Sequence, residues 1–460
     1  MNVLRDAGFN ERRCIARDVL GLYGCIVTVA RYDSVQGTAP DDLQETLHLA
    51  LRQCIDRHAA LSVVVQDATT EKPTLARLHH IDIAQHLTIL EPTVDHAEEI
   101  LQNLLDTAHS QPLMNYERQP QWRVWVRPRA DSSSCYIAFA TSHAIMDGRS
   151  GTIFHQSLLK VLHGGAQTDT EPGIDINLAP ALDKAAKFSI SWSFLLRPLL
   201  EEMLPSDMAS YLGLKSETIA WCGAQRRPTL PVDHGMLPTA VKVLLIQPDT
   251  LSRILAVCRK HKSKLTALLN FSISQSLAVV LRKRGQDYQH FTTSTPYDLR
   301  RNIPGATNRM ANYVSAVDQT VTIDRNSSLE WEAIAHATTI LQERSSTLDD
   351  QPIALLRYLS KIQEWVSKRA TQPSKESFSV SNLGNFRVDH AHDWTISQMA
   401  FSQSADATGA PLNINVASSY NGPLCIAITW WPGMLGVDDE HDFAQEVCDD
   451  LLARLESIAA

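Results

Sequence analysis

The sequence predicts an α/β protein with two mixed-sheet halves, a long crossover between them and a ligand-binding cleft where they meet. Three observations support this fold class. Strand-like and helix-like patterns alternate through the first part of the chain and start again near residue 240. Between these parts, 164–184 and 226–238 are rich in Gly or Pro, which is typical of a connection. Two halves of this kind form a cleft, where ligands prefer to bind.

The first half is predicted to alternate strands with helices. Residues 20–32 alternate as a strand does, and 41–57 have the spacing of an amphipathic helix. Phe154, Leu158 and Val161 recur at helical spacing, which indicates a helix after residue 150. The remaining elements expected here are strands at 62–66, 121–127 and 135–140 and a helix at 96–107.

The second half starts again with a strand at 240–247, and Asp249 or Thr250 is placed to cap the helix that follows. The expected helices are 265–284, 329–344, 353–369 and 438–458, and the further strands are 291–296, 312–322, 377–382, 395–402, 412–418 and 424–430. We therefore divide the chain into an N-terminal half, a crossover with a docked apolar helix and a C-terminal half, at 1–185, 186–238 and 239–460.

The composition is that of an ordinary globular chain, with 460 residues, 44% hydrophobic and 20% charged. This length exceeds what one small core needs, which fits two halves. The formal net charge of −9 argues against a nucleic-acid binder, because such proteins carry a basic surface. An anionic small ligand is compatible with this charge where a local basic patch exists.

The cysteines and the apolar stretches bear on the compartment. Eight cysteines show no Cys-x-x-Cys spacing, so we expect free thiols in a reducing compartment and no metal site. The first residues lack the apolar core of a signal peptide, and a cytoplasmic protein is expected. No stretch approaches the ~20 apolar residues of a membrane span. The closest, 188–200, is broken by Arg197 and Pro198; a packed helix is favoured for 188–212, with a lid or a membrane contact as alternatives.

The most informative run is His143-x-x-x-Asp147-Gly148, which follows the strand at 135–140. A histidine at a strand-to-helix corner can be held rigidly, and its pKa near neutrality lets it accept a proton. The acid four residues later can turn away and anchor the loop, while Gly148 leaves room for a close approach. Taken alone, such a string is common by chance and most of its instances are surface residues.

Several segments, in chain order, resemble the CoA-dependent acyltransferase superfamily. That superfamily includes the plant-type BAHD acyltransferases, the fungal alcohol O-acetyltransferases and the condensation domains of peptide synthetases. The matching segments are Arg5-x-x-Gly8-x-x-Glu11-Arg12, Arg57-His58-x-x-Leu61, His143 to Gly148, Asp298-Leu299-Arg300 and Ser381-Asn382-Leu383-Gly384. They cover nearly the whole chain, and the last resembles the alcohol acetyltransferase branch.

Some positions depart from this pattern. Ser142 stands where condensation domains carry the first histidine of H-H-x-x-x-D-G, and Ser62 where they often carry arginine. The D-F-G-W-G string of plant members is absent from the sequence. These departures favour a free-standing alcohol or amine acyltransferase over a peptide-synthetase domain.

The resemblance implies two chloramphenicol-acetyltransferase-like halves with the active site in the cleft between them. It implies transfer of an acyl group, most simply acetyl, from acyl-CoA to a hydroxyl or amine of a small natural product. His143 would be the general base, and Asp147 would pair with an arginine to hold the loop, Arg300 being favoured over Arg301. Ser381 and Asn382 are candidate donors to the oxyanion, with strand-ending turn residues as the alternative.

A basic run precedes the helix at 265–284. Arg259, Lys262, Ser263 and Lys264 are candidates for binding the phosphates of CoA, because free amides and cations at a helix N-terminus favour anions. A solvated basic helix end is the alternative.

Two other functions stay open from the sequence. A condensation-like enzyme would take its acyl group from a carrier-protein thioester, and a non-catalytic protein on the same fold would only bind. The intact His143, Asp147 and Gly148 argue against the second. We expect a monomer.

Overall fold

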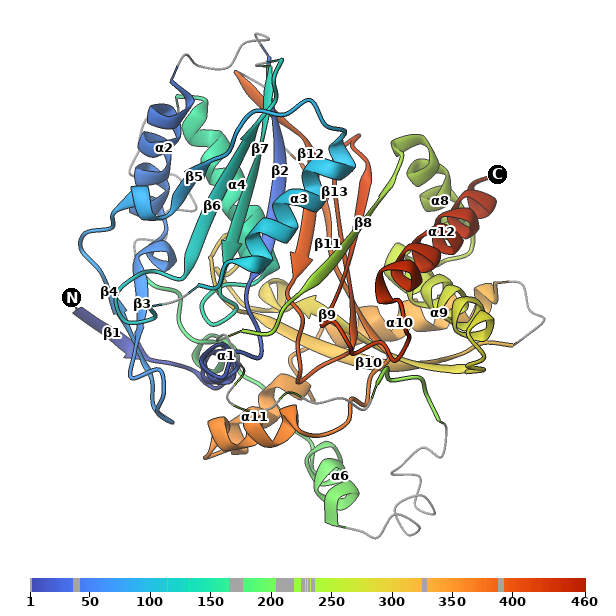
Figure 1. Cartoon of the computed structure of the whole chain (residues 1–460). Coiled ribbons are helices and arrows are strands. Elements are labelled where there is room, and N and C mark those ends of the chain that lie inside the picture. Colours follow the sequence, from blue (N-terminus) through green and yellow to red (C-terminus); the bar gives the residue numbers. More distant parts are fainter. Residues whose placement is uncertain are drawn as a thin grey trace.

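The structure, a computed structural model of the chain, describes residues 2–35, 42–113, 115–131, 133–164, 177–203, 219–224, 228, 230, 232, 236–324, 329–387 and 393–460, without the helix side chains at 197–199 and 201–203. Two lobes lie side by side, each built on a sheet that helices cover (Figure 1). The predicted fold class of two mixed-sheet halves is confirmed.

The N-terminal half contains β1 (Asn2–Asp6), α1 (Phe9–Val19), β2 (Ile26–Ser34), α2 (Leu43–Arg57), the 3-10 helix η1 (Ala59–Ser62), β3 (Val63–Gln66), β4 (Thr74–Arg77), η2 (Ile83–Gln85), β5 (Leu87–Ile89), α3 (Ala97–Ser110), β6 (Trp122–Pro128), β7 (Ser134–Thr141) and α4 (Gly148–Leu162). The described part of the crossover holds α5 (Leu182–Ala185) and α6 (Trp192–Met203). The rest of the predicted crossover, including much of 204–235, lies outside the described residues.

The C-terminal half contains β8 (Ala240–Ile246), α8 (Pro248–Lys260), α9 (Leu265–Lys283), β9 (His290–Asp298), η4 (Arg300–Asn302), β10 (Val314–Thr322), α10 (Trp331–Ser345), η5 (Pro352–Tyr358), α11 (Ile362–Ala370), β11 (Phe378–Phe386), β12 (Trp394–Gln403), β13 (Leu412–Ser419), β14 (Leu424–Trp430) and α12 (Glu440–Ala459). Most of these elements match the ranges expected from sequence to within a few residues.

The second half of the chain supplies one strand to the N-terminal sheet. The N-terminal sheet has the order β12-β2-β7-β6-β5 and the C-terminal sheet the order β10-β9-β11-β13-β14-β8, beside a small sheet β1-β4-β3. Strand β12 comes from the second half of the chain, yet it pairs antiparallel with β2, with Phe401 opposite Thr28. The division predicted at residue 239 is therefore wrong for β12, because the N-terminal sheet is completed by a strand from beyond it.

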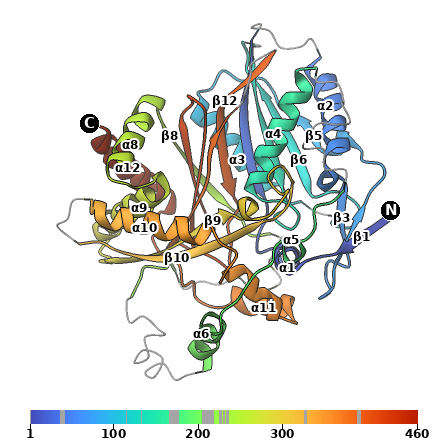
Figure 2. The same cartoon turned by 180° about the vertical axis from the view of Figure 1, so that it is seen from behind.

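Strand alternation decides which helices cover the N-terminal sheet. In β7, Ile137 and Phe139 lie in one core cluster with α2 and α4, while Ala138 and Ala140 lie in another with α3. Successive strand residues point to opposite faces, so α4 and α3 lie on opposite sides of the sheet, as the views from front and back show (Figures 1 and 2). The α3 cluster also includes Val243 of β8, so this helix joins the two lobes.

Helix α9 is the core helix of the C-terminal lobe. By length and composition it is apolar enough to cross a membrane, which corrects the expectation that no stretch approaches this limit. However, 72% of its most apolar window is buried inside the protein, against the sheet and α12. The apolar character is therefore explained by packing.

Two predicted elements are wrong at their ends. The strand expected at 20–32 begins only at Ile26, because α1 ends in a tight turn in which Gly21 has a φ of 70° and Leu22 N–H donates to Arg17 O. The helix expected at 353–369 is split into η5 and α11. The Glu71 carboxylate accepts hydrogen bonds from the Ile362 and Gln363 amides, which caps a new helix start there.

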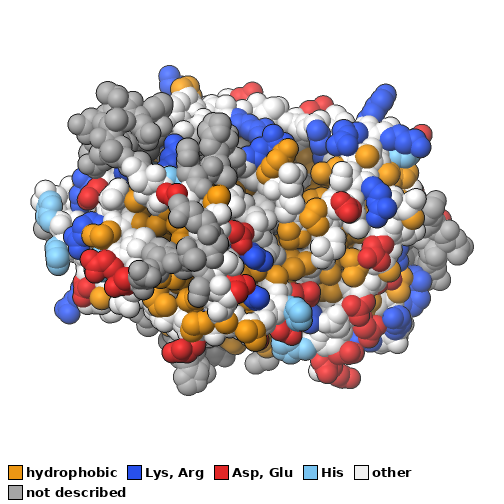
Figure 3. Space-filling model, turned by 90° about the horizontal axis from the view of Figure 1, so that it is seen from above, with side chains coloured by type: hydrophobic (Ala, Val, Ile, Leu, Met, Phe, Trp, Pro, Cys, Tyr) orange, Lys and Arg blue, Asp and Glu red, His pale blue; other side chains and the backbone are white. Residues whose placement is uncertain are grey.

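The predicted cap of α8 is also wrong. Helix α8 starts two or three residues earlier than expected, with Gln247 at the N-cap and Pro248 at the first position. Asp249 lies in the first turn, where its charge favours the helix dipole. On the face seen from above, cationic and anionic side chains are interspersed (Figure 3).

Candidate active site

The His143 motif forms the connection between β7 and α4. Strand β7 is buried along its whole length, and Asp147 is the N-cap of α4, with Oδ1 accepting from the Ser150 amide at 2.9 Å. The strand fixes one end of the loop and the cap fixes the other. His143 lies between these two fixed points.

Asp147 and Arg300 form a buried, bidentate ion pair, which confirms the predicted partner. Arg300 Nη1 lies 2.7 Å from Asp147 Oδ2, and Nη2 lies 3.0 Å from Oδ1. The exposed fractions of the two side chains are 2% and 1%. The competing candidate Arg301 is exposed. The pair links the motif loop of one half to η4 of the other.

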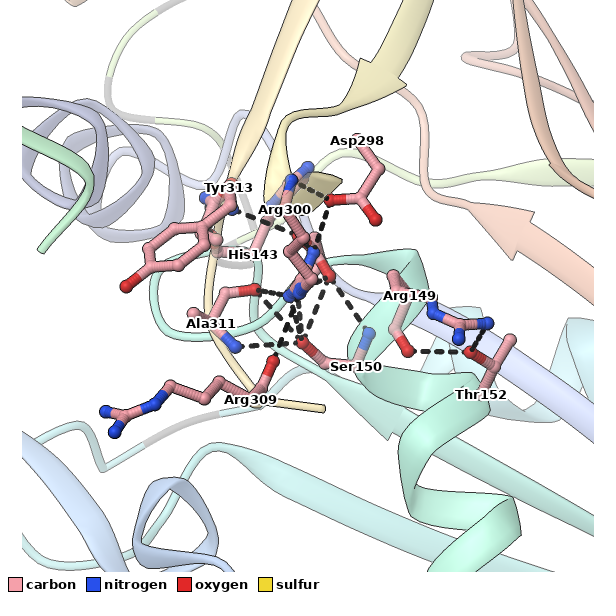
Figure 4. A network of polar contacts seen from close by, with 11 residues as sticks. His143, Arg149, Ser150, Thr152, Asp298, Arg300, Arg309, Ala311 and Tyr313 are labelled. Carbon is pink, nitrogen blue, oxygen red and sulfur yellow. Dashed lines mark hydrogen bonds and ion pairs between the residues drawn. The ribbon is translucent and has the colours of Figure 1, made fainter. Parts of the chain in front are cut away.

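Further contacts satisfy both members of the pair (Figure 4). Arg300 also donates to Asp298 at 2.9 Å, to the Arg309 carbonyl at 3.1 Å and to the Ala311 carbonyl at 2.7 Å. Asp147 Oδ2 accepts from the Tyr313 amide at 3.0 Å. Burial alone would raise the pKa of Asp147, but Arg300 and these amides hold it below its usual value. Asp147 is thus a fixed carboxylate that holds structure and has no free lone pair for proton transfer.

His143 lines a large cavity between the halves, with a volume of about 1780 Å³. Its backbone carbonyl accepts from Asn312 Nδ2 at 2.6 Å, and its ring lies 5.8 Å from the ring of Tyr23. Ring atom Nδ1 is buried and bonds to no other residue that the structure describes. Because Nδ1 is enclosed, Nε2 is the ring nitrogen that can meet a ligand.

The surroundings of His143 keep its ring neutral. Burial lowers the pKa to about 3, and the nearby cations Arg17 and Arg13 add to this effect, while Asp147 opposes it. A lowered pKa means that the neutral imidazole persists well below pH 7. The ring is therefore in the form that accepts a proton over the physiological range.

Helix α1 and the segment that follows it supply cavity residues that the sequence analysis missed. Arg13, Arg17 and Tyr23 all line the cavity. Arg17 Nη1 lies 2.6 Å from Asp406 Oδ2, and its guanidinium sits 4.4 Å from the centre of the Tyr23 ring. The sequence does carry a signal for these residues: two arginines lie four positions apart, on one face of a helix that a glycine ends.

Ser142 anchors the motif from the opposite side. Its hydroxyl donates to Asp18 and accepts from the Ala144 amide at 3.0 Å. Burial raises the pKa of Asp18 to about 7, against the bond from Ser142 and the charge of Arg17. The residue that replaces the first histidine of the condensation-type motif thus ties the loop to α1.

Gly148 is needed for packing between elements of the two halves. A Cβ at this position would lie 2.7 Å from Leu383 Cδ2 and 3.0 Å from Phe401 Cε2. Leu383 belongs to β11 and Phe401 to the exchanged strand β12. The close approach expected from the sequence is therefore made by side chains of the C-terminal half.

Ser381 and Asn382 lie on β11 and both line the cavity with His143. Asn382 Nδ2 donates to Thr266 Oγ1 at 3.1 Å, and its Oδ1 accepts from the Gly384 amide at 2.8 Å. Its side chain therefore ties β11 to α9. Ser381 is the better placed of the two to meet a ligand, because its buried hydroxyl has no such bond within the described chain.

Within the basic run, only Lys264 lines the cavity. Arg259 and Lys262 are exposed outside it. Ser263 is buried and its hydroxyl donates to the Cys258 carbonyl at 3.2 Å, so it is not free to bind a phosphate, contrary to expectation. The run is thus reduced to one cavity residue at the N-cap of α9 and two exposed neighbours.

No group of three or more metal-ligating side chains gathers in the portion of the chain that the structure describes. Counted over the described residues, the cavity wall carries six cationic side chains and four carboxyls: Arg13, Arg17, Arg149, Lys264, Arg300 and Arg301, with Asp147, Asp298, Glu376 and Asp406. A protein with net charge −9 therefore encloses a cavity with an excess of cations. Such a wall suits an anionic ligand.

The chain is similar to known fungal proteins along its length. It is 25% identical to the "Probable alcohol acetyltransferase FCK4" of Fusarium pseudograminearum, over 98% of this chain and 94% of that one. It is 21% identical to the "Probable alcohol acetyltransferase crmB" of Aspergillus fumigatus, over 93% and 95%. An uncharacterised protein of Schizosaccharomyces pombe is 21% identical, over 99% and 98%.

Solved structures share the fold. The trichothecene 15-O-acetyltransferase TRI3 of Fusarium sporotrichioides matches with a TM-score of 0.66 at 14% identity, over 98% of this chain and 94% of that one. The first condensation domain of the calcium-dependent antibiotic synthetase matches with a TM-score of 0.64 at 14% identity, over 100% and 98%. Residues 95–453 match the family model described as alcohol acetyltransferase. The chain belongs to the alcohol acetyltransferase family, within the superfamily of CoA-dependent acyltransferases and condensation domains, and is an acyltransferase.

Proposed function

We propose that the protein transfers an acetyl group from acetyl-CoA to a hydroxyl of a small natural product, with His143 as the general base. The observation that carries this proposal is a neutral histidine on the wall of a cavity between the halves, held by a buried Asp147–Arg300 pair. The names of the alcohol acetyltransferase relatives support a hydroxyl over an amine. The cavity volume of about 1780 Å³ accommodates a small-molecule acceptor.

His143 Nε2 accepts the proton of the acceptor hydroxyl as its oxygen attacks the thioester carbonyl. A new C–O bond forms and the C–S bond breaks, so the acetyl group ends on the acceptor. The proton then passes from Nε2 to the thiolate that leaves. A base in this position contributes ~10²–10⁴-fold to the rate. Ser381 is our candidate donor to the oxyanion of the tetrahedral intermediate.

Lys264 is our candidate for binding a phosphate of CoA. It is exposed, lies at the N-cap of the long helix α9 and lines the cavity. Its backbone amide donates to Thr338, which fixes the backbone and leaves the ammonium group for a ligand. Arg259 and Lys262 can add positive charge outside the cavity.

The test measures ester formation by mass spectrometry with acetyl-CoA and a panel of alcohols and amines. His143→Ala should lower turnover by ~10²-fold or more with the fold intact. Tyr116→Phe is a matched control, a ring outside the cavity wall, and should keep full activity. Near-full activity of His143→Ala would overturn the role of the base.

The same assay separates the other candidate donor. The structural likeness to a condensation domain keeps a carrier-protein thioester as the alternative. Free CoA should inhibit competitively against acetyl-CoA if CoA is the donor. Transfer that requires an acyl carrier protein and is not inhibited by free CoA would support the alternative instead.

A further inference from the structure

The cavity wall beside His143 holds a cation without an anionic partner. Arg13 Nε donates to Asn10 Oδ1 at 3.2 Å, and Nη2 reaches Cys14 Sγ at 4.0 Å. No carboxylate within the described residues forms an ion pair with Arg13. Arg13 lines the cavity.

Arg17, one turn further along α1, shows the contrast. Its guanidinium is neutralised by Asp406 at 2.6 Å and also contacts the Tyr23 ring and Cys14 Sγ. Arg17 is therefore engaged in an ion pair by the protein itself, whereas Arg13 forms no ion pair with a described carboxylate and feels the charge of Asp406 only at longer range. Burial and the charge of Arg17 lower the pKa of Arg13, although Cys14 and the carboxylate of Asp406 act in the opposite direction, and a bound anion would relieve the lowering.

Arg13 and Lys264 lie on walls made of different elements. Helix α1 packs against α5, η5 and α11, while Lys264 is bonded to Thr338 of α10. If the donor nucleotide is held near Lys264, as proposed above, the Arg13 position is left for the acceptor. The cavity of about 1780 Å³ exceeds the usual ~300–1,000 Å³ of a small-molecule site, which leaves room for both.

The part of the cavity wall that η5 forms is apolar. Ile353 and Leu356 lie on η5, which packs against α1, and both line the cavity with Ile26. A ligand that bonds to Arg13 would lay its skeleton against these side chains. One unmatched cation suits one negative charge, and a guanidinium matches the two oxygens of a carboxylate.

We infer that the preferred acceptor is an amphipathic hydroxy acid whose carboxylate binds Arg13 while its hydroxyl reaches His143. This inference rests on the proposed function and names its substrate class. Arg13 is here a specificity residue that binds the carboxylate of the acceptor. It takes no part in the proton transfer.

The experiment compares a hydroxydecanoate with its methyl ester as acceptors at one pH. We expect the wild type to have the lower KM for the acid. Arg13→Met should raise the KM for the acid by ~10- to 100-fold, the loss of a charge-assisted bond, and leave the ester's KM nearly unchanged. Arg13→Lys should restore part of the preference. Arg12→Met, next to it but off the cavity wall, should keep the wild-type ratio of acid to ester.

Binding without donor gives a second readout. Decanoate, which has no hydroxyl to acylate, should bind the wild type and Arg12→Met in calorimetry and should not bind Arg13→Met. Equal use of acid and ester by the wild type, or equal losses for both in Arg13→Met, would overturn the inference while acyl transfer itself stands. Arg13-dependent binding of decanoate without any acyl transfer would keep the carboxylate site and reject the proposed function.

Discussion

Breaking the Asp147–Arg300 pair should strongly destabilise the fold, and the structure indicates how much each change costs. Arg300→Met leaves Asp147 with 1% of its side chain exposed and, among the described residues, with the Ser150 amide, the Ser150 hydroxyl and the Tyr313 amide as donors. Removing one partner of a buried pair costs ~3–5 kcal/mol, because the other charge is stranded. These three remaining donors place this variant near the lower end of that range.

Asp147→Asn should lower the free energy of unfolding by less than Arg300→Met does. Arg300 keeps Asp298 at 2.9 Å and the carbonyls of Arg309 and Ala311, so its charge is not stranded. Losing one hydrogen-bonded charge costs ~1.5–3 kcal/mol. The double variant should then be less destabilised than the sum, with a coupling above ~0.5 kcal/mol.

Denaturant unfolding of the two single variants and the double variant measures this coupling. Hydrogen exchange over residues 142–150 reports whether the motif loop opens. Faster exchange confined to this loop indicates local opening, whereas a general loss of stability would raise exchange throughout the protein. Tyr297→Phe, which removes a hydroxyl bonded to Gln351 in the same lobe, is a control outside the pair. Additive effects of Asp147→Asn and Arg300→Met would refute the reasoning.

Three further outcomes follow from the site. Burial, Arg17 and Arg13 lower the pKa of His143 to about 3, so kcat/KM should not fall as the pH drops from 7 to ~5. Arg13→Met should shift the acid limb of the pH profile to higher pH. An acid limb at the ordinary histidine pKa in the wild type would contradict this. Lys264→Ala should raise the KM for acetyl-CoA but not for an acetyl-pantetheine lacking the nucleotide, less so at high salt; equal effects on both donors would reject the phosphate contact. Gly148→Ala should lower the free energy of unfolding by ~1–3 kcal/mol, measured by thermal unfolding, because the new Cβ clashes with Leu383. Adding Leu383→Ala should restore part of this stability. A Gly148→Ala variant as stable as the wild type would show that the halves pack differently.

The parts of the site that could be predicted are those whose residues lie close in sequence. His143, Asp147 and Gly148 occupy one loop between a buried strand and a helix, so their local geometry follows from two elements with clear periodicity. Arg300 was found because the superfamily pattern places an arginine there, and its bidentate pair with Asp147 is confirmed.

The parts that could not be predicted depend on contacts between distant segments. The role of α1 at the cavity requires Arg17 to meet Asp406, which is 389 positions away. The cap that splits η5 from α11 comes from Glu71, on the other half. Ser263 looked free in the sequence, but its hydroxyl is used by the turn that it follows. Periodicity reports on the face of one element and carries no information about such partners.

The exchanged strand β12 has a consequence for synthesis on the ribosome. Strand β2 pairs with β7 on one side and with β12, Trp394–Gln403, on the other. Strand β7 has been synthesised once the chain reaches Thr141, but β12 follows much later. About 250 residues separate the two, which takes roughly 13–50 s at ~5–20 residues per second. During that interval the nascent chain presents an open sheet edge, which is a template for mispairing. A fragment that stops at residue 239 would keep this edge permanently, so the N-terminal half should aggregate when expressed alone and regain solubility when a peptide of β12 is supplied.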